Sequence, residues 1–169
     1  MEILNHFFKW IKNKLLLILL ISFITLIIIG TYSSRYQPFE EEFVGIEFRL
    51  NEDVYTEKLL IFDGKLSNPI IGSKRFKGRI LYEEEIYETN LRFKNNRADI
   101  FVFEGKTKSN QVLREIYIDD NFEKIAITIH EKTSYNTTSW NSNTGLIFVT
   151  PASDKEMGLK LFEELSFRE

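Results

Sequence analysis

The apolar and polar positions of this chain follow three patterns in succession. Residues 15–32, from Leu15 to Tyr32, form an apolar run without a charged side chain. From Phe43 onward, apolar and polar residues alternate in short segments, and the last twenty residues change to a spacing of three to four. The first pattern is long enough to cross roughly 30 Å of hydrocarbon as a helix. The second is typical of strands with one buried face, and the third of an amphipathic helix.

The apolar run predicts a single transmembrane helix over residues 15–32, with the lipid bilayer as its partner. Lys9, Lys12 and Lys14 precede it, whereas Arg35 is the only basic residue close behind it, before three glutamates at 40–42. Basic residues flank membrane helices mainly on the cytoplasmic side. We therefore expect a cytoplasmic tail over residues 1–14 and the C-terminal domain outside the cell membrane.

Two other interpretations of this run remain open. A cleaved signal peptide also begins with basic residues, but no A-x-A site follows, and the chain has three alanines, all after residue 97. A lipoprotein is excluded because there is no cysteine to carry the lipid. A buried core helix would need a larger surrounding domain than the remaining chain provides.

Residues 33–42 are predicted to form a polar tether, because Pro38 interrupts a helix and the glutamates favour solvent. Residues 43–169 are predicted to form one β-rich extracytoplasmic domain of about seven or eight short strands. The turn signals that separate them include Asp63-Gly64, which closes a short strand at 58–62, and the polar segment 94–97.

The end of the domain is predicted to be a helix over about residues 153–166. Ser153 and Glu156 have the spacing of a capping box, and the apolar stripe is formed by Met157, Leu161, Phe162 and Leu165. Strands come first and the helix last, which argues against a doubly wound sheet. The expected fold class is therefore one transmembrane helix followed by an α+β, mostly antiparallel domain, built as a curved sheet or small sandwich with the helix on one face.

Charge and cysteine content narrow the function further. Residues 36–169 carry 18 Lys and Arg and 24 Asp and Glu, a net charge of −6, which makes this domain a poor nucleic-acid binder. It is also not expected to lie flat on anionic lipid. Without cysteine, an exported domain of this size must be stabilised by its core alone.

No motif in the sequence predicts catalysis, a metal or a cofactor. His130 is the one histidine of the exported part and is interpreted as an exposed residue at a strand end. Zinc would need several His or Cys ligands. The glutamates at 40–42 and 83–85 are interpreted as solvated charge clusters, and Asp119-Asp120-Asn121 lacks the alternating spacing of a calcium loop. We predict no catalytic, cofactor-binding or metal-binding residue.

The best candidate for a partner contact is the polar loop at residues 131–144. It carries Trp140 among small polar residues, with Tyr135 and Asn141 nearby, a composition found in binding loops. The alternative is that the indole of Trp140 folds back to cover an edge of the sheet.

The end of the chain also resembles a known group. Ser139-Trp140-Asn141-Ser142, Gly145-Leu146-Ile147 and Thr150-Pro151-Ala152-Ser153, followed by a short amphipathic helix, are similar to the ending of small uncharacterised membrane-anchored proteins of spore-forming Gram-positive bacteria. The resemblance covers about thirty residues. It implies a bacterial cell-envelope setting and no particular activity.

Together these patterns favour a single-pass membrane protein whose outer domain is a non-enzymatic binding, sensing or immunity-type module for an unknown protein or envelope partner. Two alternatives stay open. One is a small envelope hydrolase that uses His130 or paired carboxylates. The other is an accessory subunit of a membrane complex, packed through its apolar helix.

Overall fold

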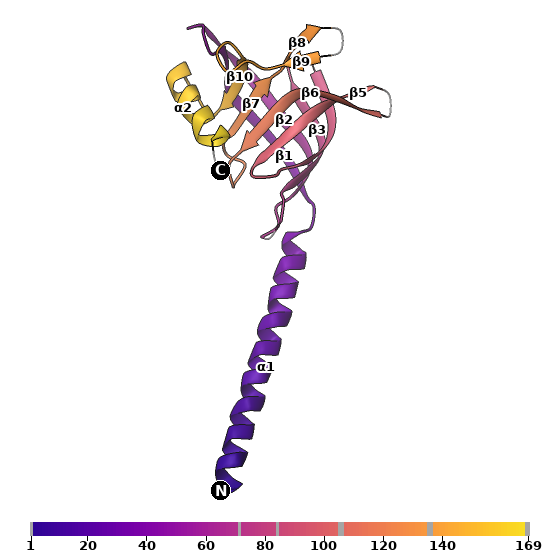
Figure 1. The fold of residues 1–169 in the computed structure, drawn as a ribbon, viewed down its shortest axis with the longest axis vertical. Coiled ribbons are helices and arrows are strands. Elements are labelled where there is room, and N and C mark those ends of the chain that lie inside the picture. The colour runs from indigo at the N-terminus through magenta and orange to yellow at the C-terminus, as the bar shows by residue number, and fades with distance from the viewer. Residues whose placement is uncertain (1, 71, 84, 105–106, 135–136, 168–169) are drawn as a thin grey trace.

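A long helix leads into a domain of strands that a second helix completes (Figure 1). The computed structural model describes residues 2–167 except 71, 84, 105–106 and 135–136, and it describes the backbone alone at 2–13, 33, 101–104, 107–113, 132 and 134. The predicted combination of an N-terminal apolar helix, a mostly antiparallel β domain and a C-terminal helix is confirmed.

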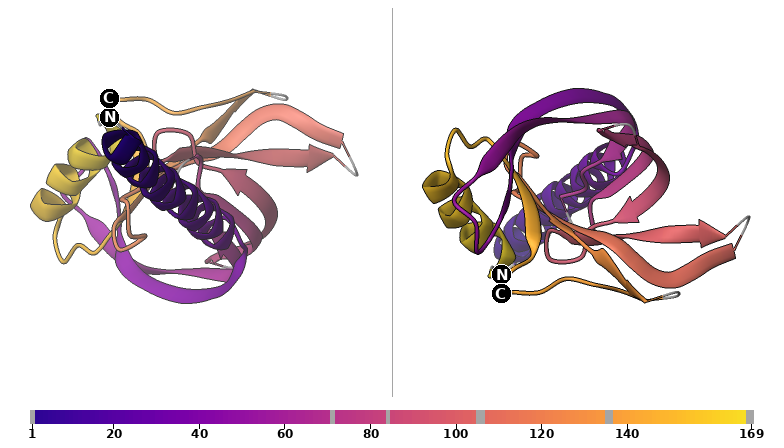
Figure 2. Two further views of the ribbon diagram at one scale, coloured as in Figure 1. Left: turned by 90° about the horizontal axis from the view of Figure 1, so that it is seen from below. Right: turned by 90° about the horizontal axis from the view of Figure 1, so that it is seen from above.

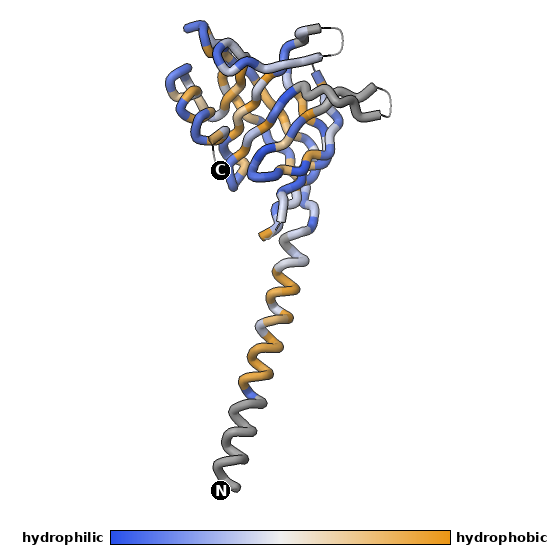
Figure 3. Tube along the Cα trace, in the orientation of Figure 1, coloured by the Kyte–Doolittle hydropathy of each residue, from blue (hydrophilic) through white to orange (hydrophobic). Residues whose placement is uncertain are grey.

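Helix α1 (Glu2–Ser33) stands apart from the domain, and the coloured part of its trace is mostly hydrophobic (Figure 3). Between Leu15 and Tyr32 its large apolar side chains are 46–68% exposed. The hydroxyls of Thr25 and Thr31 donate to the carbonyls of Ile21 and Ile28, so these two polar groups are satisfied within the helix. The segment Lys14–Tyr32 is long and apolar enough to cross a membrane, a test that a signal sequence also passes.

Eight of the strands in the described residues form one antiparallel sheet in the order β4-β3-β2-β1-β10-β7-β6-β5. They are β1 (Gln37–Arg49), β2 (Tyr55–Ser67), β3 (Arg75–Tyr82), β4 (Glu85–Arg92), β5 (Arg97–Glu104), β6 (Thr107–Ile118), β7 (Ile125–Ile129) and β10 (Leu146–Thr150). A separate hairpin is formed by β8 (Glu131–Ser134) and β9 (Thr137–Ser139). Most neighbouring strands are therefore also neighbours in sequence.

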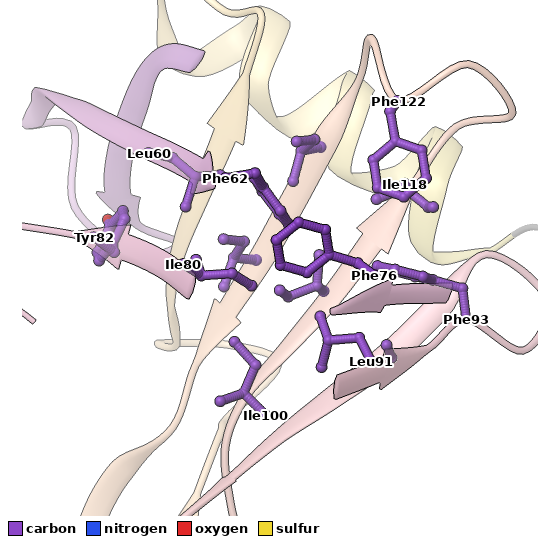
Figure 4. Packing of buried hydrophobic residues seen from close by; sticks show 14 of the residues in the cluster. Leu60, Phe62, Phe76, Ile80, Tyr82, Leu91, Phe93, Ile100, Ile118 and Phe122 are labelled. Carbon is purple, nitrogen blue, oxygen red and sulfur yellow. The ribbon is translucent and has the colours of Figure 1, made fainter. Parts of the chain in front are cut away.

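The sheet curls strongly, so that its two edge strands, β4 and β5, approach each other at the turn that joins them (Figure 2). Its concave side holds the main core, where buried aromatic rings meet edge to face, as in the pair Phe62–Phe76 at 5.0 Å between centroids (Figure 4). Two facing glycines permit the curl. A Cβ on Gly64 of β2 would lie 2.7 Å from the Cα of Gly78 on β3, so neither position has room for a side chain.

Helix α2 (Lys155–Ser166) covers the convex side of β1, β10 and β7 and creates a second core. Leu161, Phe162 and Leu165 of the predicted stripe are buried there. The closest approach is at Gly158, where a Cβ would lie 2.8 Å from Cε1 of Phe48. Because both faces of β7 are covered, Ala126 and Thr128 are as buried as Ile125 and Ile127.

Several sequence-based details are wrong. The predicted tether at 33–42 is too long, because β1 begins at Gln37 and pairs with β2 up to Leu66. Asp63-Gly64 is not a turn, since β2 continues through it to Ser67. The N-cap of α2 is Asp154, whose Oδ1 accepts the backbone N–H of Met157 at 2.9 Å, in place of a Ser153–Glu156 capping box. Met157 itself is 48% exposed.

Candidate functional site

Trp140, the leading candidate for a partner contact, lies against its own domain. Its Nε1 donates to the carbonyl of Leu146 at 3.1 Å, and its ring centroid lies 5.8 Å from that of Phe162 on α2. The side chain is half-buried and packs on the second core. The indole therefore covers an edge of that core, which is the alternative that the sequence left open.

The two neighbours of Trp140 in the prediction do not join it in one surface. Asn141 is exposed, and its Oδ1 accepts the backbone N–H of Asn143 at 2.8 Å, which shapes the turn before β10. Tyr135 lies outside the described residues. A role of Trp140 and Asn141 in partner binding stays a prediction.

A cleft of about 640 Å³ opens between the C-terminal end of α2 and the region where the end of β4 turns into the start of β5. Among the described residues β4 and β5 share no ladder, and the bridge between Lys94 and Arg97 lies in the turn that joins them. Leu165 and Ser166 of α2 form the opposite wall. The sequence identified residues 94–97 only as a polar turn, since the curl that places α2 beside it cannot be read from local spacing.

The lining of the cleft combines exposed cations with buried polar atoms that have no hydrogen bond, of which Asp99 Oδ1 lies 3.7 Å from Nε of Arg97. Arg92 and Lys94 are exposed, and neither forms an ion pair with a described residue. Asp99 Oδ1 and Ser166 Oγ are buried without a hydrogen bond. Such atoms are uncommon because each costs free energy until water or a ligand satisfies it. The cleft thus offers positive charge to an incoming acidic segment.

His130 and Glu115 lie behind one wall of this cleft. The wall residue Arg97 donates to Glu115 Oε1 at 2.7 Å, and Tyr117 donates to Glu115 Oε2 at 2.7 Å. His130 Nε2 is 3.8 Å from Glu115 Oε1, and its side chain is 13% exposed. The prediction that His130 is exposed at the end of a strand is therefore wrong. Its ring is largely buried and faces Glu115.

Burial shifts the pKa of two of these side chains, His130 and Tyr117. Desolvation lowers the pKa of His130, against the opposing effect of Glu115 and Asp99, and burial raises the pKa of Tyr117, aided by its hydrogen bond to Glu115. The imidazole is therefore neutral at pH 7. Since neither His130 nor Glu115 lines the cleft, they have no direct path to a bound substrate.

A second polar cluster closes the far end of the concave side. The guanidinium of Arg114 lies 4.6 Å from the ring centroid of Tyr82 and 5.3 Å from that of Tyr87, and it donates to Tyr87 Oη and Glu85 Oε2. Tyr82 in turn donates to Glu47 Oε2 at 2.5 Å. Arg114 Nη1 is buried without a hydrogen bond. The sequence did not single out this residue, because an isolated Arg within a strand carries no motif.

Acidic residues considered for cation binding are engaged within the fold. Asp119 Oδ1 accepts the backbone N–H groups of Glu123 and Lys124, and Asp120 pairs with Lys74 at 3.0 Å. Over the residues that the structure describes, no group of three or more His, Asp or Glu side chains is arranged to hold a metal ion.

The chain matches no protein-family model, and comparisons with curated proteins and with solved structures find no match either.

Proposed function

We propose that this chain is a single-pass membrane-anchored protein whose β-rich domain, outside the cytoplasm, is a non-enzymatic binding module. The anchor is Lys14–Tyr32, with a mean hydropathy of 2.7 and no residue buried in the domain. Nineteen helical residues extend for about 28 Å, close to the thickness of the hydrocarbon layer. In water this surface would be exposed at a cost of about 25 cal/mol for each Å².

The orientation rests on the charges at the two ends of α1. Three lysines lie in the six residues before Leu15, and the segment that follows is acidic at residues 40–42. The positive-inside tendency supports a cytoplasmic N-terminus. Directly after α1, the carbonyl of Ser34 accepts a hydrogen bond from Ser67 Oγ at 2.9 Å, which ties the end of the anchor to the domain.

The cleft carries the binding part of the proposal. Its lining includes the exposed Arg92 and Lys94, which form no ion pair with a described residue, so an acidic partner segment would pair with them. The enzymatic alternative is weaker, because the buried His130 and Glu115 face each other behind the wall of the cleft. The partner is an unidentified protein of the cell envelope.

Single-cysteine variants can test both location and binding, because the chain has no cysteine of its own. Asn95→Cys places a thiol in the cleft, Glu156→Cys places one at the start of α2, and Asn5→Cys places one in the N-terminal tail. Intact cells that produce each variant are treated with a membrane-impermeant, thiol-reactive photo-crosslinker.

We expect labelling at positions 95 and 156 but not at 5, and a discrete cross-linked adduct from position 95 alone. The additional change Lys94→Glu should abolish the adduct without reducing labelling. If the cysteines at positions 95 and 156 are labelled but position 95 gives no adduct, the proposed binding site is refuted. If the cysteine at position 5 is labelled and the one at position 95 is not, the proposed location outside the cytoplasm is refuted.

A further inference from the structure

Four cations lie side by side on the outer face of β2, β3 and β4, where the strands leave the curl. Lys65 is directly opposite Lys77, and Arg75 is directly opposite Arg92. All four side chains are exposed, and none forms an ion pair with a described residue. We call these four residues the basic patch. Side chains directly opposite each other in an antiparallel pair have Cβ atoms about 5 Å apart, so two like-charge pairs here destabilise the sheet.

Two residues further along the same strands, opposite charges face each other across β2, β3 and β4. Arg79, two residues along β3, is opposite Asp63 and forms an ion pair with it, and Glu88 lies opposite Arg79 on β4. Among β2, β3 and β4, directly opposed like charges are therefore confined to one end, whereas Asp63 also lies directly opposite Glu40 of β1. The basic patch also stands out within a domain of net charge −6. A local excess of positive charge that costs stability indicates an anionic ligand.

That end of the strands is the end at which α1 enters the domain. Ser67, directly opposite Arg75, donates to the carbonyl of Ser34, the first residue after α1. Arg75 and Arg92 are therefore level with the end of the apolar helix. Lys65 and Lys77 lie two residues further along β2 and β3, about 7 Å beyond the level of Arg75 and Arg92. The whole basic patch is thus within roughly one Debye length, about 8–10 Å, of the level at which α1 ends.

An apolar side chain lies at the same end. The loop between β2 and β3 is beside the C-terminal end of α1 (Figures 1 and 3), and its Ile70 is 70% exposed. Tyr32, the last residue of the apolar segment, is 65% exposed. Apolar and aromatic groups next to cations are the combination found at the interface between hydrocarbon and headgroups.

We infer that the basic patch holds the domain against anionic phospholipid headgroups of the bilayer that α1 spans. This inference rests on the proposed membrane anchoring. The guanidinium groups of Arg75 and Arg92 donate in pairs to lipid phosphate oxygens, and Lys65 and Lys77 add point charges. The acidic remainder of the domain is repelled by the same surface. The two effects fix which side of the domain faces the membrane.

The test uses the full-length chain in lipid nanodiscs, with a fluorophore on the single cysteine of Asn90→Cys, which is opposite Lys77, or of Glu156→Cys at the start of α2. Lipids with a spin label on the headgroup quench the fluorophore by contact. We expect strong quenching at position 90 in phosphatidylglycerol nanodiscs, weak quenching in phosphatidylcholine, and little at position 156 in either. Added salt should reduce the difference between the two lipids.

Two double variants that remove the same charge serve as the test and its control. Each cation near an anionic surface raises the ratio of docked to undocked domain about fivefold. The double variant Arg75→Gln with Arg92→Gln should therefore lower this ratio about 25-fold. Lys58→Gln with Lys160→Gln removes the same charge elsewhere and should leave that ratio unchanged. Both Lys58 and Lys160 lie outside the basic patch, on β2 and α2.

Three results would overturn the inference or its basis. Equal quenching at position 90 in both lipids, with the chain still co-eluting with the nanodisc, would refute headgroup binding and leave the anchor intact. Failure to co-elute would instead refute the anchor. Protection of position 90 by soluble polyphosphate in phosphatidylcholine nanodiscs, without any effect of phosphatidylglycerol, would assign the basic patch to a soluble anionic polymer and refute headgroup binding.

Discussion

Replacing Trp140 separates its packing role from a role in partner binding. Truncation of a fully buried Trp to Ala costs about 3–5 kcal/mol, and Trp140 is half-buried, so the lost packing is worth about 2 kcal/mol. Its hydrogen bond to the Leu146 carbonyl adds about 1 kcal/mol. Trp140→Ala should therefore lower the free energy of unfolding by about 3 kcal/mol. Trp140→Phe keeps a ring against Phe162 and should lower it by about 1 kcal/mol.

The assay is urea unfolding of the full-length protein in detergent, followed by circular dichroism, since the substitution removes a fluorophore. Lys160→Ala, on the exposed side of α2, serves as the control and should change the unfolding free energy by less than about 0.5 kcal/mol. A Trp140→Ala protein as stable as the wild type, and unable to form the cross-linked adduct, would refute the packing role and favour Trp140 as the contact.

Three further predictions concern stability. Lys77→Glu replaces a like-charge pair with an opposite-charge pair across from Lys65, so the unfolding free energy should rise by about 0.5–1 kcal/mol in urea titration, and a fall would contradict the strand register. Gly64→Ala should lower it by about 1–3 kcal/mol, because the new Cβ would overlap Gly78; an unchanged thermal midpoint would argue against the tight curl. The pKa of His130 is lowered in the folded state, so the unfolded state takes up its proton first as pH falls below about 6.5. The free energy of unfolding should therefore drop between pH 7 and 5, and it should drop less in His130→Gln. Parallel pH profiles of the two proteins would show that the ring is not desolvated.

Local patterns in the sequence were sufficient for the order and type of the main elements. An uncharged run of eighteen residues identifies a helix by its length, and the stripe of Leu161, Phe162 and Leu165 identifies one by its spacing. Both signals lie within the helix itself. The alternation of Ile125 and Ile127 likewise identified a strand of the core.

The errors arose where a distant partner decided the outcome. Gly64 resembles a turn residue, but its lack of a side chain is required by the close approach of Gly78, fourteen residues later. The acidic segment from Gln37 resembles a tether, yet β2 is long enough to pair with it. The covered outer face of β7 depends on where α2 docks, which no alternation within β7 reveals.

The cleft and the basic patch were hidden for the same reason. Arg92 and Lys94 are ordinary charged residues near a hairpin turn until the curl places α2 beside them. Lys65 and Lys77 are twelve residues apart, and only the register of β2 and β3 shows that they face each other. The net acidity of the domain argued against contact with anionic lipid. A net charge is an average over the domain, however, and it conceals a local cluster of the opposite sign.

Protease digestion of intact spheroplasts tests the central claim, a retained anchor with the domain outside, most directly. Membranes washed in alkaline carbonate should retain the full 20.0 kDa chain, and digestion from outside should remove the β-rich domain and leave an N-terminal fragment of roughly 35 residues. A chain recovered from the cytosol, a chain fully protected from the protease, or a soluble product that begins after α1 would contradict the account.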